Sequence, residues 1–184
     1  MPRLPSFWRK RGDAVPEGDI VTELTQFPQM CSAVPVPVVL AGEHRLALAY
    51  RLDLEPRSPI GYETIRPIDP EEIGPVVFVK FEQFTAVKFG HPNDEGLGGH
   101  RLWGRGLVPY AVNEVRDSSW LREIVRIDQA HYNYTPGMRD GTRHLVFSFH
   151  DTTLEVLTRS FTFETLATSV GRLLPQMQAF VNGP

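Results

Sequence analysis

RHLVFSFHDTTLEVLTR, residues 143–159, is the stretch of this chain that decides the fold. Large apolar side chains occupy every second position on each side of a polar centre, which is the period of two strands that bury one face. The apolar positions are Leu145, Phe147, Phe149, Leu154 and Val156. A two-residue turn at Asp151-Thr152 pairs Phe149 with Leu154 and places all five on one side of a β-hairpin.

The same hairpin carries a polar face opposite its apolar face. That face comprises His144, Ser148, His150, Glu155 and Arg159. In this register Ser148 lies directly across from Glu155, and His150 lies diagonal to Glu155. We interpret the face as a polar cluster in a pocket, with a solvent-facing hairpin as the alternative. A one-residue slip in register would scatter this set of side chains.

Four further segments have strand character. Alternation over 36–40 and 45–50 predicts a hairpin with Gly42 in its turn, and prolines at 35 and 37 put its first strand at a sheet edge. Residues 76–89 form the strongest strand pattern, with Glu82-Gln83 as either a tight turn or a bulge. A further strand is expected over 107–115.

Two segments have helical periodicity. Ser119 is a suitable N-cap for a helix over 120–130. An apolar stripe over 164–182 predicts a second helix that Pro175 kinks or breaks, and the stripe should face the core or a dimer partner. If the stripe faces the core, we expect this helix to pack on the sheet face formed by Leu145, Phe147 and Phe149. We therefore predict an α+β fold, a curved, mostly antiparallel sheet of about six strands with two main helices packed on one face.

Composition bounds the class of protein. The chain has 184 residues, 41% of them hydrophobic, and a formal net charge of −3, which suits one globular domain and argues against nucleic acid as a partner. We divide it into a proline-rich, partly flexible N-terminal arm (1–30) and a single α+β domain (31–184). One cysteine, no apolar run of roughly 20 residues and no signal-like start lead us to expect a cytoplasmic protein without a membrane partner.

The sequence FGHPNDEGLGGHRLWGRGL, residues 89–107, is the candidate functional loop. Asn93 and Asp94 favour a turn that presents backbone N–H groups, and the glycines allow a ligand close to the backbone. His100 with Asp94 or Glu95 would form an acid–base pair. Turn capping by these acids is the alternative. No dinucleotide-binding, P-loop or H-E-x-x-H motif is present.

These observations lead to one main functional hypothesis. The protein would be a small enzyme doing acid–base chemistry on a polar or anionic small molecule, as an isomerase, lyase, cyclase or hydrolase. His100 would act as acid or base with Asp94 or Glu95 as its orienter, and His150 and Glu155 would be the partner pair. Substrate binding is assigned to Arg101, Arg105, Asn93 and Ser148.

Three alternatives stay open. A divalent metal, which no motif requires, would be held by His100, His150 and Glu155 in a metal-assisted variant. The same pocket would serve a non-catalytic small-molecule-binding module. The loop would be an epitope in a protein-interaction domain of the immunity or scaffold kind. His91 and His144 receive no assignment.

Overall fold

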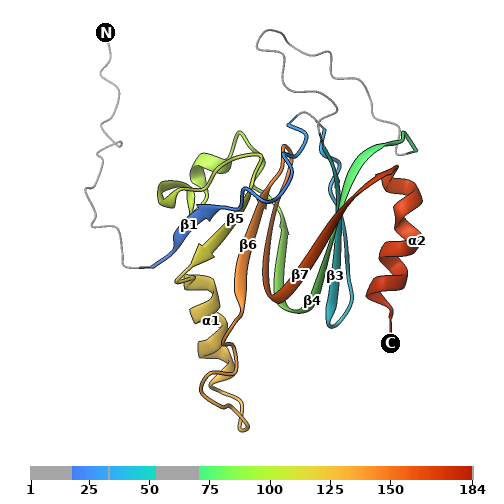
Figure 1. Ribbon diagram of the computed structural model, residues 1–184. Coiled ribbons are helices and arrows are strands. Elements are labelled where there is room, and N and C mark those ends of the chain that lie inside the picture. The colour runs from blue at the N-terminus through green and yellow to red at the C-terminus, as the bar shows by residue number, and fades with distance from the viewer. Residues whose placement is uncertain (1–17, 33, 53–70, 184) are drawn as a thin grey trace, which may run out of the picture.

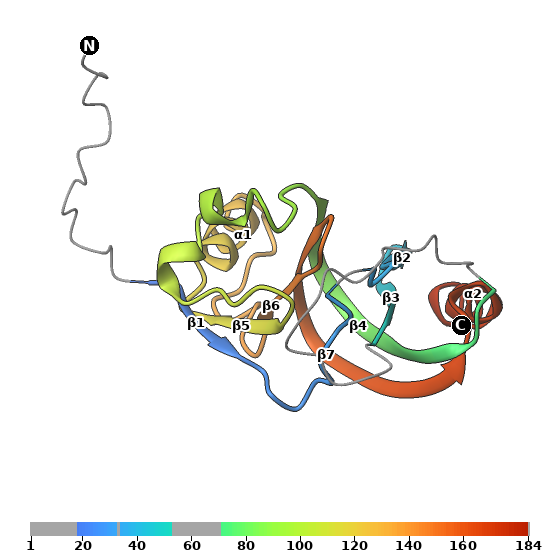
Figure 2. The same cartoon turned by 90° about the horizontal axis from the view of Figure 1, so that it is seen from above.

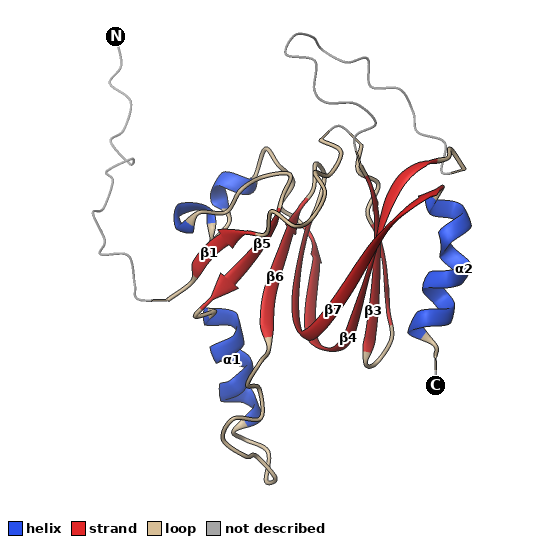
Figure 3. Cartoon of the chain, in the orientation of Figure 1, coloured by secondary structure: helices blue, strands red, loops and turns tan. Residues whose placement is uncertain are grey.

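The computed structural model describes residues 18–32, 34–52 and 71–183. Its centre is one antiparallel sheet of seven strands in the order β1-β5-β6-β7-β4-β3-β2, and two α-helices accompany it (Figures 1 and 3). The predicted α+β class is confirmed, with seven strands rather than six. The elements are β1 (Ile20–Glu23), β2 (Val38–Ala41), β3 (Arg45–Arg51), β4 (Gly74–Gly90), β5 (Val112–Arg116), α1 (Ser119–Asp128), β6 (Arg143–Ser148), β7 (Thr153–Thr168) and α2 (Val170–Val181).

The long strands β4 and β7 form the most extensive strand pair of the sheet. They pair over nearly their whole length, while β3 joins only the first half of β4 and β6 joins only the first half of β7. A bulge between Phe84 and Ala86 shifts the β4–β7 register, so the predicted irregularity is a bulge within one strand and not a turn. Because bulges bend and twist a strand, this pair is strongly curved when seen from above (Figure 2).

The hairpin at 143–159 forms with a register different from the predicted one. Leu154 pairs with Phe147 rather than with Phe149, and the connection is a four-residue loop closed by a Phe149 N–H···O=C Thr152 bond. The physical reason is that Asp-Thr does not favour the positive φ values of a two-residue turn. A shift of two residues leaves each strand side chain on its predicted face. It moves His150 out of the strand and places Val146, not Ser148, opposite Glu155.

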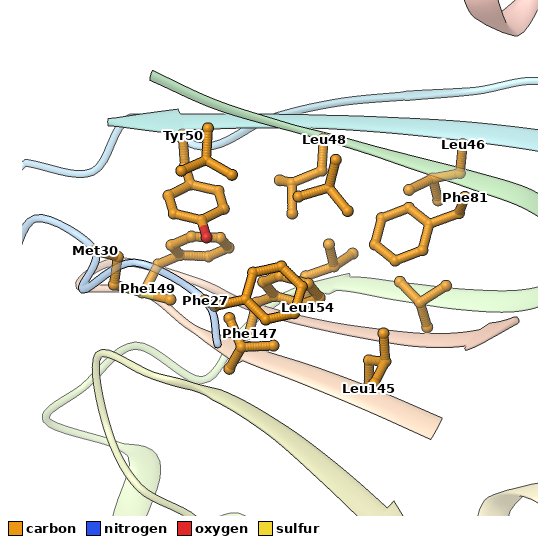
Figure 4. Close-up of a cluster of buried hydrophobic side chains, with 14 residues drawn as sticks. Phe27, Met30, Leu46, Leu48, Tyr50, Phe81, Leu145, Phe147, Phe149 and Leu154 are labelled. Atoms are coloured by element: carbon orange, nitrogen blue, oxygen red, sulfur yellow. The ribbon is translucent and has the colours of Figure 1, made fainter. Parts of the chain in front are cut away.

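The concave face of the sheet holds the main core. Alternate side chains of β3, β4, β6 and β7 meet there, and Phe147 packs against the rings of Phe27, Tyr50 and Phe81 (Figure 4). Phe27 and Met30 belong to this core, and β1 pairs with β5. Residues 20–23 and 27–30, assigned above to the arm, therefore contribute to the sheet and its interior.

Helix α2 packs on the opposite face from the one expected. Its apolar stripe of Val170, Leu173 and Met177 is buried against Ala47, Ala49, Val76 and Phe78, so the stripe is core. The concave face is already filled by aromatic side chains, which leaves the outer face for the helix. Residues 164–168 extend β7 and are not helical, and the helix continues through Pro175.

Helix α1 begins one residue earlier than expected. Ser118, not Ser119, is the N-cap, because its hydroxyl accepts the Leu121 N–H at 3.0 Å. Trp120 anchors the first turn on the outer face, where it contacts His144. The strand expected over 107–115 begins at Val112 rather than at residue 107. The β2–β3 hairpin is confirmed, with β2 at the sheet edge. Neither helix is long and apolar enough to cross a bilayer, judged over the described ranges.

Candidate functional site

The loop that follows β4 is an ordered cover on the outer face of the sheet. It contains two short 3-10 turns, Leu97–Gly99 and Trp103–Arg105. Three leucines at a spacing of five residues point inward and bury against Val115 and Val146, and these are Leu97, Leu102 and Leu107. Burial of these leucines fixes the shape of the loop. The polar side chains of the loop therefore have fixed positions.

Glu155 is the centre of a buried polar cluster beneath this loop. Its carboxylate lies 2.9 Å from His144 Nε2, 3.5 Å from His100 Nε2 and 2.5 Å from Arg101 Nη2. The side chains of Glu155 and His100 are only 7% and 8% exposed, and that of His144 is fully covered. Only the guanidinium of Arg101 reaches solvent.

The hydrogen bonds around this cluster define the tautomers of both imidazoles. His100 Nδ1 accepts the Leu102 N–H, so a neutral His100 carries its proton on Nε2 and presents it to Glu155. Ser118 Oγ lies 2.8 Å from His144 Nδ1. An ionised Glu155 can only accept, so His144 Nε2 donates to it and His144 Nδ1 accepts the Ser118 hydroxyl. Both rings then have their two nitrogens engaged inside the protein.

The electrostatics of the cluster favour an ionised Glu155 beside a neutral His144. Burial raises the pKa of Glu155, but hydrogen bonds from His100 and His144 and the charge of Arg101 outweigh it and hold that pKa well below its ordinary value. Burial lowers the pKa of His144, and its bond to Glu155 offsets only part of this effect. Glu155 is thus a charged hydrogen-bond acceptor, and His144 is its neutral donor.

Arg101 links the buried cluster to the N-terminal segment. Its Nη1 lies 3.6 Å from Asp19 Oδ2 and 3.4 Å from Ser119 Oγ. Asp19 in turn accepts the backbone N–H and the hydroxyl of Ser119, at 2.7 and 2.6 Å. Arg101 thus joins the β7 carboxylate to the start of α1 and to the residue before β1.

A second polar cluster lies where the loop begins, and it reaches the surface. Asp94 Oδ2 accepts a hydrogen bond from the hydroxyl of Tyr110 and lies 2.9 Å from His150 Nδ1. The backbone of Asp94 also donates to the carbonyl of His150 at 2.8 Å. The His150 ring stays 35% exposed, and the Asp94 side chain is 19% exposed.

The environment of this second cluster favours the charged form of its acid. Burial raises the pKa of Asp94, but hydrogen bonds from Tyr110, the Glu95 N–H and His150 outweigh it, so the pKa lies below its ordinary value. Tyr110 has φ +53°, a left-handed conformation that is costly for an aromatic residue. Such strain is concentrated at functional sites in proteins.

The structure therefore divides the predicted site residues between two clusters. His100 meets Glu155 and not Asp94 or Glu95, while His150 meets Asp94 and not Glu155. Glu95 is exposed, and the predicted clamp Arg101 is bound to Glu155. His100, His150 and Glu155 do not converge as metal ligands. Over the described ranges no group of three or more His, Cys, Asp or Glu side chains is arranged to hold a metal ion.

Two of the remaining predicted substrate-binding residues, Asn93 and Arg105, form hydrogen bonds within the protein, and the third, Ser148, is buried. Asn93 Oδ1 accepts the Gly96 N–H at 3.0 Å, in the kind of turn expected. Arg105 donates to the carbonyl of Gly18. Ser148 is fully buried across from Thr153, and its hydroxyl has no partner among the described residues.

Two residues of these clusters carried no functional assignment from sequence. From the sequence, Tyr110 is interpreted as an apolar side chain within a strand. Its position directly after Pro109 and before β5 is also compatible with a residue outside the strand. His144 follows Arg143 and lies on the polar face of the predicted hairpin. The one indication of a role was that it shares this face with Glu155. No model of a known family matches the chain, and comparisons with curated proteins and with solved structures found no match. The functional case therefore rests on geometry.

Proposed function

We propose that this protein is a small acid–base enzyme in which His150 exchanges protons with a polar small molecule and Asp94 orients its ring. The observation that carries the proposal is the contact of 2.9 Å between His150 Nδ1 and Asp94 Oδ2, on a ring that is still partly exposed. A carboxylate on Nδ1 favours the Nδ1–H tautomer and leaves Nε2, which lies 4.0 Å from the exposed carboxylate of Asp151, as the base. Positioned bases of this kind accelerate proton transfer by about 10²–10⁴-fold.

Tyr110 supports the same role from the other side of the carboxylate. Its hydroxyl donates to Asp94, and its ring is stacked at 6.4 Å from the His150 ring. Hydrogen bonds from Tyr110, the Glu95 N–H and His150 keep Asp94 ionised, which stabilises the imidazolium that forms when His150 takes a proton. Asp94 and Tyr110 are thus positioning residues, and His150 is the residue that would touch the substrate.

The buried cluster around Glu155 has a different part in this proposal. Its imidazoles are engaged at both nitrogens, and burial keeps His100 and His144 away from solvent. Glu155 and Arg101 would hold the loop over the sheet so that Asp94 keeps its position beside His150. The substrate class is accordingly defined by His150 alone, as a molecule with an exchangeable or transferable proton.

The first test needs no substrate. Long-range ¹H–¹⁵N NMR spectra of the imidazoles, recorded at neutral pH, report which ring nitrogen carries the proton. We expect the Nδ1–H tautomer for His150 in the native protein and its loss in Asp94→Asn. The Nε2–H tautomer in the native protein would contradict the proposal.

The second test measures turnover. Model reactions that need a base are followed, namely hydrolysis of p-nitrophenyl esters and deuterium exchange beside the carbonyl of 2-oxo acids. We expect His150→Ala and Asp94→Asn to lower kcat/KM by about 10²–10⁴-fold in any reaction the native protein accelerates. His44→Ala removes an exposed turn imidazole and should change nothing. Activity that survives in both site variants, or no acceleration of any reaction by the native protein, would reject the proposal.

A further inference from the structure

A hollow of about 660 Å³ lies beside α1, and Ser118, which contacts His144 in the cluster around Glu155, is among its lining residues. Three segments enclose it: the end of β5 with its turn (114–118), one face of α1 (121–129) and the chain that leads into β6 (134–143). In Figure 1 α1 and this chain extend together beyond the end of β5. The volume is within the range of about 300–1,000 Å³ that small-molecule sites occupy.

The lining of this hollow combines apolar and basic side chains. Its apolar side chains are Val115, Leu121, Val125, Tyr134 and Met138. Five arginines line it, Arg116, Arg122, Arg126, Arg139 and Arg143, against three acids, Glu114, Asp117 and Asp140. Counting also Asp128, whose carboxylate binds Arg139, the local formal charge is +1, while the whole chain carries −3.

Several of these arginines are already used by the fold. Arg139 forms two bonds to Asp128, at 2.6 and 3.1 Å, and Arg143 binds Glu114 at 2.5 Å. Arg122 donates to the carbonyl of Asp117. Arg116 and Arg126 are exposed and have no acidic partner among the described residues. These two guanidiniums supply the positive charge that the hollow offers to a ligand.

We propose that this hollow binds a small organic anion, a carboxylate or phosphate attached to a flat apolar body. The apolar body would lie on Val125 and Leu121, and the anion would contact Arg116 and Arg126. Guanidinium groups bind both anions through paired N–H donors, so the two sources share one chemistry. The site is independent of the acid–base chemistry proposed for His150.

The test maps binding on the ¹⁵N-labelled protein by amide chemical shifts. The probes are phenyl phosphate, benzoate, the neutral benzyl alcohol and inorganic phosphate. We expect both aromatic anions to shift amides of α1 and 134–143 saturably, with Kd of about 1 mM or below, and the other two probes to bind at least tenfold more weakly. The tighter of the two anions identifies the source as phosphate or carboxylate.

Variants assign the binding to the unpaired guanidiniums. The double variant Arg116→Gln/Arg126→Gln should weaken both aromatic anions at least tenfold and leave the thermal unfolding temperature unchanged. Arg172→Gln, which removes one guanidinium on α2 outside the hollow, should bind like the native protein. No saturable shift in these segments, equal binding of benzyl alcohol, or native-like binding by the double variant would overturn the proposal. Since His150→Ala should bind the probes normally, failure here is distinct from failure of the acid–base proposal.

Discussion

Glu155 carries its charge inside the protein because donors surround it on several sides. Two imidazole Nε2 atoms and one guanidinium face its two oxygens within 3.5 Å. A carboxylate without these groups would be too costly to bury in this position. The same donors fix the loop to the sheet, so a single side chain on β7 determines where residues 100 and 101 lie.

Replacing Glu155 by Gln should therefore be strongly destabilising. The amide removes the charge that Arg101 and the imidazoles share, and its own N–H group faces other donors. We expect the free energy of unfolding in urea to fall by about 3–5 kcal/mol, the usual cost of breaking a buried ion pair.

The matched control for this change is Glu95→Gln, the same chemical change at an exposed position of the covering loop. Its effect on the unfolding free energy should stay within about 0.5 kcal/mol. Equal effects of the two substitutions would show that the carboxylate of Glu155 has no special role in the fold.

At the scale of the element, α2 shows how a helix accommodates an internal proline, a residue that disfavours helical structure. Pro175 is exposed in the middle of the helix, and its ring removes the N–H that would donate to the Gly171 carbonyl. Ser169, fully buried, caps the first turn through the Arg172 N–H. Burial of Leu173 and Met177 then stabilises the helix in spite of the missing bond.

Pro175→Ala should make the protein more stable. Restoring the backbone bond and a good helix former should raise the unfolding free energy by roughly 1–3 kcal/mol, with part of the gain offset by a more flexible unfolded chain. Gln176→Ala, at the neighbouring exposed position, serves as the control and should have little effect. A loss of stability in Pro175→Ala would mean that the helix needs the proline to seat Leu173 and Met177.

At the scale of the whole molecule, the buried titratable groups determine how stability varies with pH. Because the pKa of His144 is lowered in the fold, the unfolded chain binds a proton below the ordinary value of 6.5 while the native protein does not. Because the pKa of Glu155 is also lowered, the unfolded chain binds another proton below 4.5. Both effects have the same sign, so acid favours the unfolded state.

Stability should consequently fall as the pH is lowered from 7.5 to 5, and His144 should cause part of the fall. One such group contributes a slope of up to about 1.4 kcal/mol per pH unit. In His144→Gln, which keeps an N–H for Glu155 but does not titrate, urea unfolding should show a flatter profile in this interval. Profiles of equal slope in the two proteins would contradict this assignment.

Much of the architecture was predictable because strand and helix periods are local properties of a chain. Alternation at 143–159 placed five apolar side chains on one face, and even a register error of two residues left them there. Prolines at 35 and 37 correctly put β2 at an edge. The side on which α2 packs was not predictable, since it depends on which face the aromatic residues had already filled.

What the sequence alone determined is the strands and helices other than β1 and the face that each of these strands' side chains occupies, because periodicity acts through neighbouring residues. Only the tertiary structure decided which imidazole meets which carboxylate. A loop of four residues instead of two removed His150 from the strand and gave it to Asp94, while the covering loop brought His100 to Glu155. The hollow beside α1 likewise exists only where three separate segments meet, and no local pattern records such a meeting.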